Sequence, residues 1–165
     1  MVTSVGPQKL PYTISSVSSE DQDHPATELL VQHPDSPGWQ TERYSQFPQE
    51  IELQLSAPAR LVQLQVLSHE FKTPRTAVIY ASSLPPGCSD PSEAVEKRLG
   101  YLHFGDAERA GFQTRELKTI TLEGTHALFV RLVLQEYQVN QHNIWNQIGL
   151  CAINLVGAHR CPQLA

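Results

Sequence analysis

The sequence has 165 residues, of which 40% are hydrophobic and 18% are charged, a composition typical of one globular domain with a buried core. Its formal net charge of −5 disfavours phosphate backbones and anionic lipid headgroups, so we expect neither nucleic acid nor a membrane surface as a partner. The N-terminal stretch lacks a basic segment followed by an apolar one, and no apolar run approaches ~18 residues, so neither secretion nor membrane insertion is expected.

Short segments with the period of a β-strand recur along the chain, separated by turns rich in Gly, Pro, Ser and Asp. The clearest one alternates Ile51, Leu53 and Leu55 with polar residues, as in a strand with one face in water. We predict an all-β sandwich of two antiparallel sheets, with strands at residues 12–18, 49–55, 61–69, 75–82, 100–104, 114–122, 126–135 and 148–157.

The segment 126–135 carries apolar residues on both faces, which favours a central strand covered on both sides. Two short helices are predicted as connectors, 25–32 and 91–99, each with a proline at its start. The domain is expected to span 1–157, followed by a tail or linker at 158–165. The predicted core includes Ile51, Leu53, Leu64, Val66, Leu132 and Leu150.

The chemistry-bearing residue types show no catalytic pattern. Cys88, Cys151 and Cys161 are odd in number and lack C-x-x-C spacing, which indicates free thiols in a reducing, cytoplasmic compartment. Cys151 lies inside an apolar segment and is interpreted as an inert core residue. The seven histidines are scattered, and neither a G-x-S-x-G turn nor a glycine-rich phosphate loop is present. We therefore predict no enzyme and no cofactor.

The acidic loop at residues 20–23 offers carboxylates that could ligate a hard cation, with Asp21 and Asp23 as weak calcium candidates. The alternative is a solvated acidic loop, because the segment lacks the ligand spacing and the glycine of a helix-loop-helix calcium site. We commit to no metal ligand on this pattern.

Two loops carry the residues of a possible binding surface: one around Trp39, and one at 139–150 that is rich in Asn and Gln around Trp145. Loops on a rigid sandwich commonly carry binding residues, and aromatic and Arg side chains are enriched at interface centres. Each Trp could instead plug an end of the core, and the amides could serve only to hold the long loop in shape. The partner-binding hypothesis comprises Trp39, Arg43, Tyr44, His69, Asn143 and Trp145.

The residues also carry a resemblance to a known family. The segments 18–25, 38–39 and 47–50 resemble the galactose-binding-like, discoidin-type jelly roll. Within that superfamily the chain is similar to a small calcium-binding subunit of the intraflagellar transport complex. It resembles more closely the N-terminal domain of the 104-kilodalton centrosomal protein family, through segments 38–39, 46–51, 98–101, 115–118, 139–140, 143–147 and 152–154.

This resemblance implies a jelly-roll domain of a cytoplasmic protein found at centrioles and ciliary tips, with ciliary or centriolar proteins as partners. Tubulin binding is then expected from other domains of such a protein. In the transport subunit an Asp-Gly turn lies near the calcium, whereas the matching stretch here offers Asp35 and lacks that turn. We predict a non-catalytic protein-interaction module; the alternative is a carbohydrate-binding module that uses Trp39 or Trp145 as a stacking platform.

Overall fold

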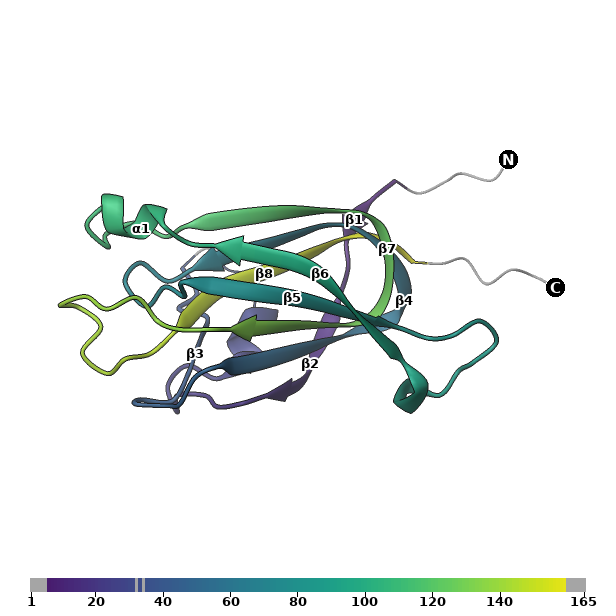
Figure 1. The fold of residues 1–165 in the computed structure, drawn as a ribbon, viewed down its shortest axis with the longest axis horizontal. Coiled ribbons are helices and arrows are strands. Elements are labelled where there is room, and N and C mark those ends of the chain that lie inside the picture. Colours follow the sequence, from purple (N-terminus) through teal and green to yellow (C-terminus); the bar gives the residue numbers. More distant parts are fainter. Residues whose placement is uncertain (1–5, 32, 34, 160–165) are drawn as a thin grey trace.

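Two long strands, β4 (Gln49–Ser68) and β7 (Leu117–Leu134), run side by side through both layers of a β-sandwich (Figure 1). The computed structural model describes residues 6–31, 33 and 35–159. Six further strands complete the sandwich: β1 (Gln8–Lys9), β2 (Tyr12–Val17), β3 (Trp39–Gln40), β5 (Thr76–Ser83), β6 (Val95–His103) and β8 (Gly149–His159). The predicted all-β, galactose-binding-like jelly roll with antiparallel strands is confirmed.

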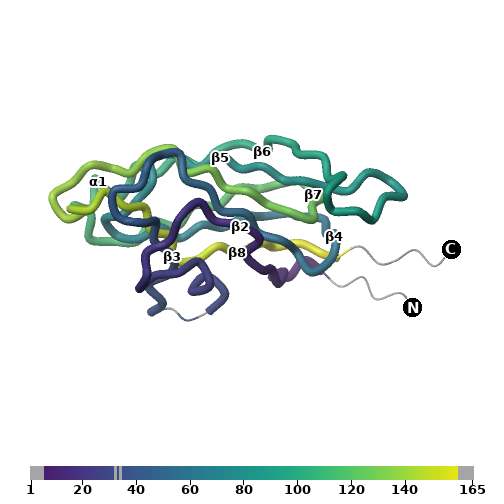
Figure 2. The backbone as a smooth tube through the Cα atoms, turned by 90° about the horizontal axis from the view of Figure 1, so that it is seen from below, coloured from purple at the N-terminus to yellow at the C-terminus, as the bar shows by residue number. Residues whose placement is uncertain are grey.

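The strand pairs define the two layers. In one layer β2, residues 49–54 of β4, residues 129–134 of β7, β5 and β6 follow one another. In the other, residues 63–67 of β4 lie between β8 and residues 117–121 of β7, and β1 pairs with β8. Both layers are visible in Figure 2, where the chain is seen at right angles to Figure 1.

The sequence predicted two separate strands for each of these long elements, and the structure joins them at a corner. The β4 register shifts between Gln54 and Ala59, where Pro58 cannot donate a backbone hydrogen bond. In β7 the corner contains Glu123 and Gly124, both with positive φ. The turn residues therefore bend the strands from one layer into the other without ending them.

The core lies between the two layers. All six predicted core residues are fully buried: Ile51, Leu53, Leu64, Val66, Leu132 and Leu150. Trp39 joins them, with 0% of its surface exposed, and its indole Nε1 donates to the Ser19 carbonyl at 2.9 Å. Of the two roles predicted for Trp39, a binding residue or a residue that fills one end of the core, the structure shows the second.

The helices differ most from the prediction. The first is the 3₁₀ helix η1 (Ala26–Leu30), while the second is only η2 (Pro91–Glu93), capped by the Asp90 side chain on the Ser92 N–H. The rest of the predicted helix 91–99 is strand β6, because pairing with β5 satisfies its backbone groups. β8 continues through Ala158 and His159, which had been assigned to the tail.

A short helix that the sequence did not predict, α1 (Asp106–Arg109), depends on a distant side chain. The buried Glu116 carboxylate accepts the backbone N–H groups of Gly105, Asp106 and Ala107 at 3.1–3.2 Å. These donors belong to the first turn of the helix and would otherwise have no partner within it. The predicted strand 114–122 consequently begins only at Leu117.

Candidate functional site

Three loops meet at the end of the sandwich that lies to the left in Figure 1: residues 41–48, 69–75 and 135–148. Two of them, 41–48 and 135–148, present neighbouring side chains to solvent. We call Arg43, Tyr44, Ile144 and Trp145 the loop-end surface. Tyr44 and Ile144 are 67% and 63% exposed, and the Arg43 side chain is 49% exposed.

Backbone hydrogen bonds join loop 41–48 to loop 135–148. The Thr41 N–H donates to the Ile148 carbonyl at 2.8 Å, and the Tyr44 N–H donates to the Trp145 carbonyl at 2.9 Å. The Tyr44 hydroxyl lies 3.3 Å from the Ile144 carbonyl oxygen. Tyr44 and Asn146 have positive φ angles of 55° and 53°, a region that Asn adopts more readily than Tyr. The two loops therefore form one ordered unit.

Buried amides hold the longer loop. Asn143, only 3% exposed, donates to the Gln147 carbonyl at 2.8 Å and accepts the Gln147 N–H at 3.0 Å. The Asn140 amide donates to the Phe71 carbonyl at 2.9 Å, which ties this loop to loop 69–75. Two roles were considered for the amides of this loop, holding the loop in shape and facing a partner. Asn143 holds the loop in shape, and its buried side chain cannot face a partner. Its inclusion in the partner-binding set is corrected on that ground.

A buried lysine lies beneath the loop-end surface. The Lys72 ammonium donates to Gln40 Oε1 at 2.6 Å and to Gln147 Oε1 at 2.8 Å. Burial lowers the pKa of Lys72, although the nearby Asp21 acts in the opposite direction. Its nitrogen is also 5.5 Å from the centre of the Trp145 ring. Sequence reasoning missed Lys72, Gln40 and Gln147 as members of this site, since no local pattern marks residues that meet only through the fold.

Asp21 connects this buried group to the surface. Its Oδ2 accepts a hydrogen bond from Gln147 Nε2 at 3.0 Å and lies 3.6 Å from Arg43 Nε. Burial acts to raise the pKa of Asp21, but the Asp23 N–H, the Gln147 amide and nearby positive charges outweigh it, so the net shift is downward. The Arg43 guanidinium carbon in turn lies 3.7 Å from the centre of the Trp145 ring, a cation–π contact. Arg43 is therefore held between a carboxylate and an aromatic face.

His69 belongs to the supporting structure. Its side chain is 12% exposed, and its Nδ1 accepts the N–H groups of Phe71 and Lys72 at 3.3 Å each. Burial lowers the pKa of His69 to about 4, with Glu70 opposing that shift. The Phe71 ring lies 4.5 Å from that of His69 and 5.7 Å from that of His142, centre to centre. His69 and His142 therefore both contact Phe71.

The calcium candidates are not gathered into one site. Asp21 is held by Gln147 and Arg43, Asp23 is exposed, and Asp35 has a 91% exposed side chain that lies 3.9 Å from His33. Across residues 6–31, 33 and 35–159, no group of three or more His, Cys, Asp or Glu side chains is arranged to hold a metal ion.

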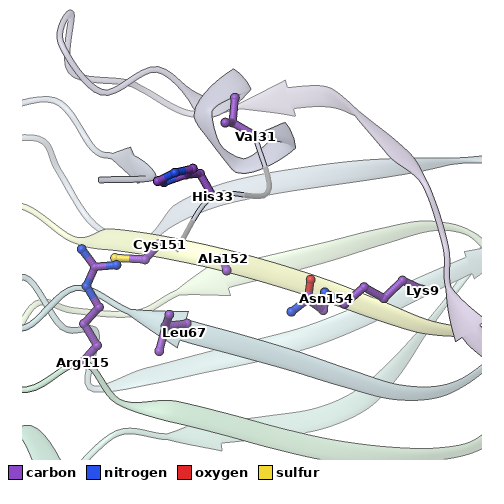
Figure 3. A pocket seen from close by; sticks show the side chains of 8 residues that line it. All are labelled: Lys9, Val31, His33, Leu67, Arg115, Cys151, Ala152 and Asn154. Carbon is purple, nitrogen blue, oxygen red and sulfur yellow. The ribbon is translucent and has the colours of Figure 1, made fainter. Parts of the chain in front are cut away.

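A separate pocket of about 240 Å³ opens on the outer face of β8 beside η1 (Figure 3). In Figure 3 the Arg115 guanidinium points toward Cys151. Arg115 is already paired with Glu70 at 2.9 Å, and burial raises the pKa of the Cys151 thiol to about 11. A thiol with that pKa stays protonated near neutral pH and is a poor nucleophile, as the inert interpretation of Cys151 requires. Cys161 lies outside the described residues.

The lining of this pocket mixes basic and apolar groups: Lys9, Val31, His33, Leu67, Arg115, Cys151, Ala152 and Asn154. None of the residues predicted to bind a partner is among them.

In the part of the chain that the structure describes, no helix has the length and apolar character needed to cross a membrane.

Comparison with solved structures places the fold among jelly-roll modules. A family 32 carbohydrate-binding module from C. perfringens NanJ, in complex with galactose, superimposes with a TM-score of 0.69 at 13% identity, covering 91% of this chain and 98% of that one. A chain from the crystal structure of reduced XRCC1 bound to the catalytic domain of DNA polymerase β gives 0.66 at 15% identity, covering 94% and 100%. At these identities the likeness shows the fold alone.

Sequence comparison shows the family. The centrosomal protein of 104 kDa from Homo sapiens is 35% identical over 152 residues, and the Mus musculus protein is 34% identical over the same length. Each match covers 92% of this chain but only 16% of the relative, so the chain spans about a sixth of their length. The profile of the family described as "Centrosomal protein CEP104, N-terminal domain" matches residues 38–157. The chain therefore belongs to the CEP104 N-terminal domain family of centrosomal proteins.

Proposed function

We propose that this chain is a non-catalytic protein-interaction module of a cytoplasmic protein of centrioles and ciliary tips, and that it binds a ciliary or centriolar protein through the loop-end surface. The observation that carries the proposal is the fixed placement of Arg43 on the Trp145 ring, beside the exposed Tyr44 and Ile144. Tubulin binding, implied by the family resemblance, is assigned to other parts of such a protein.

Pre-organisation supports a binding role for this surface. Ordering flexible side chains during association costs free energy, and here the buried Lys72 and Gln147, together with Asp21, have already ordered the loops. Tyr and Arg side chains are also enriched among the residues that dominate binding energy. The loop-end surface contains both types, Arg43 and Tyr44, and the exposed Ile144 adds an apolar neighbour.

The carbohydrate alternative draws on the same end of the fold but has fewer suitable side chains. A sugar stacks on an open aromatic face. Trp39 offers none, because it is fully buried, and one face of Trp145 is already covered by Arg43. Tyr44 is the remaining exposed aromatic residue among those predicted to bind. This leaves a protein partner as the better match.

The proposal is tested with two surface variants, Arg43→Glu and Ile144→Asp. The wild-type chain and each variant are immobilised and exposed to a centriole-enriched cell fraction, and the captured proteins are quantified by mass spectrometry. We expect the same centriolar proteins to be lost with both variants. The matched control is Leu117→Asp, which changes an apolar residue of similar exposure at the start of β7, outside loops 41–48 and 135–148, and should keep these proteins.

Thermal unfolding controls for folding. All three variants should melt like the wild type, because the exposed fractions of the substituted residues are about half or more. Recovery of an unchanged set of proteins by both loop variants would refute the surface. A glycan array on which the wild type binds and Tyr44→Ala does not would instead establish the carbohydrate alternative.

A further inference from the structure

Strand β6 forms an edge of the sandwich. In the described chain it pairs with β5 on one side, and no strand pairs with its other side (Figure 1). The pairing is regular from Val95 to Arg98 and is interrupted beyond it, where the register shifts between Ile79 and Tyr80 of β5. An edge of this kind presents unpaired backbone N–H and C=O groups at alternate residues, which can accept an additional strand.

The regular part of this edge is basic, although the whole chain carries a net charge of −5. Lys97 and Arg98 are both exposed, and neither makes an ion pair or a side-chain hydrogen bond with a described residue. Glu96, between Val95 and this pair, forms an ion pair with Arg131, whose Nη2 lies 2.7 Å from its Oε1 and whose Nη1 lies 2.7 Å from Glu50 Oε1. The charge presented to a neighbouring strand is therefore positive.

A cleft of about 430 Å³ lies against the same segment. Its lining includes the buried apolar residues Ala81 and Leu122, together with Lys97. Ala81 is the register partner of Lys97, so these two residues are on the inner face of the layer. The full lining is Ala81, Ser83, Lys97, Leu122, Glu123, Gly124, Thr125 and His126.

We propose that the β6 edge from Val95 to Arg98 binds a protein partner by adding an extended, acidic segment of that partner as a further strand. Two adjacent carboxylate side chains of the segment lie opposite Lys97 and Arg98, and an apolar side chain two residues away enters the cleft. This site is separate from the loop-end surface, so each stands or fails without the other.

The alternation of a strand fixes the pattern of the segment. Lys97 shares the inner face with Ala81, whereas Arg98 shares the outer face with Tyr80. Neighbouring residues of an added strand also point to opposite faces, so two consecutive acidic residues can reach the two cations. A residue two positions from the inner carboxylate returns to the inner face, where the cleft is.

The test uses a fluorescein-labelled peptide, Thr-Val-Glu-Glu-Thr-Val-Thr, and the whole chain, with fluorescence anisotropy as the readout. We expect saturable binding that weakens as sodium chloride is added. Lys97→Glu with Arg98→Glu should weaken it about tenfold or more, equivalent to ~1.4 kcal/mol. The matched control is Lys9→Glu with Arg109→Glu, which changes the net charge equally at exposed residues of β1 and α1 and should leave binding unchanged.

Two further kinds of peptide separate strand addition from simple ionic attraction. The first replaces both Glu residues with Lys and should bind the Lys97→Glu, Arg98→Glu chain better than the wild type. The second carries N-methyl groups on alternate amides, made in both possible registers, and one register should fail to bind. Equal binding of both methylated peptides, absence of binding to the folded wild type, or equal loss in the control variant would each overturn the proposal.

Discussion

Loop 135–148 and loop 84–94 lie at opposite ends of the sandwich and are ordered by different means (Figure 1). Loop 135–148 bonds to distant parts of the chain, through Asn140 to Phe71 and through Gln147 to Thr41 and Asp21. The described hydrogen bonds of loop 84–94 join near neighbours, as between Cys88 and Pro85 or Ser92 and Asp90. Long-range polar contacts can thus make a long loop part of the folded core, whereas local ones only shape it.

The largest expected effect follows from removing the amide at the centre of the first loop. Gln147→Ala deprives the buried Lys72 ammonium of one acceptor and removes the donor to Asp21 and Thr41. We expect the free energy of unfolding to fall by ~3–4 kcal/mol, measured by urea denaturation. Gln141→Ala, an exposed amide of the same loop, is the control, and an equal loss there would contradict the difference between buried and exposed amides.

The pH dependence of stability sharpens the comparison through His69, which supports the loop end. Its pKa is about 4 in the folded chain, against 6.5 for an unperturbed histidine, because burial outweighs Glu70 and is assisted by Lys72, Arg115 and His24. The unfolded chain therefore binds this proton more tightly. Neutral His69 therefore leaves the free energy of unfolding at its full value above pH 6.5. This free energy falls as the pH falls toward 4, by roughly 3 kcal/mol in total.

Urea denaturation of the wild type and of His69→Gln at pH 7.5 and pH 4.5 measures this effect. The wild type should lose more stability between the two pH values than the variant does. Lowered pKa values of Asp21 and Glu70 place most of their own losses of stability below pH 4.5, outside the interval that is compared. Parallel pH profiles for the two chains would show that His69 is not the titrating group.

Asn143→Ala should have the next largest effect. Its amide makes two hydrogen bonds with the Gln147 backbone inside the loop, and removal leaves buried backbone groups unpaired. We expect a loss of ~1–3 kcal/mol in urea denaturation. A stability equal to that of the wild type would show that the Asn143 side chain does not hold the loop.

A smaller effect is expected in loop 84–94. Asp90→Ala removes the side-chain cap on the Ser92 N–H, in a segment that is exposed to solvent. The free energy of unfolding in urea should fall less than for either Gln147→Ala or Asn143→Ala, because water replaces the lost acceptor. A fall as large as that of Asn143→Ala would break the proposed contrast between the two loops.

The smallest effect is expected from metal removal. The carboxylate of Asp21 is already engaged by Gln147 and lies near Arg43, so the order of the loop end is attributed to protein atoms. Addition of EDTA should leave the melting temperature unchanged in differential scanning calorimetry. A decrease that calcium reverses would contradict this, since a ligand at ~100 times its dissociation constant adds about 2.7 kcal/mol.

The fold was largely readable from the sequence, because alternation in segments such as Ile51 to Leu55 is a local signal of burial. The corners at Pro58 and Gly124 were read as strand ends, since a turn signal does not show whether pairing resumes beyond it. Helix α1 was missed because its cap, Glu116, comes from outside the helix. Local preference decides most elements, and a few depend on contacts that only the fold supplies.

The candidate site was less predictable. Arg43, Tyr44 and Trp145 were identified by residue type, and they do meet at one end of the sandwich. Trp39 was grouped with them but is buried, because hydrophobicity and aromatic character suit a core position as well as a surface. Lys72 carried no local signal, since its two acceptors come from other loops.

The passage of β4 and β7 through both layers has a consequence for unfolding. Each of these two strands contributes one half to each layer. Unfolding of one layer therefore disturbs the strands that hold the other, so the domain should melt as one cooperative unit. Amide protons of Val66 and Leu132, which lie in different layers, should therefore exchange with solvent at similar global free energies. The same sharing makes folding depend on contacts distant in sequence, which predicts a slow folding rate for a chain of this size.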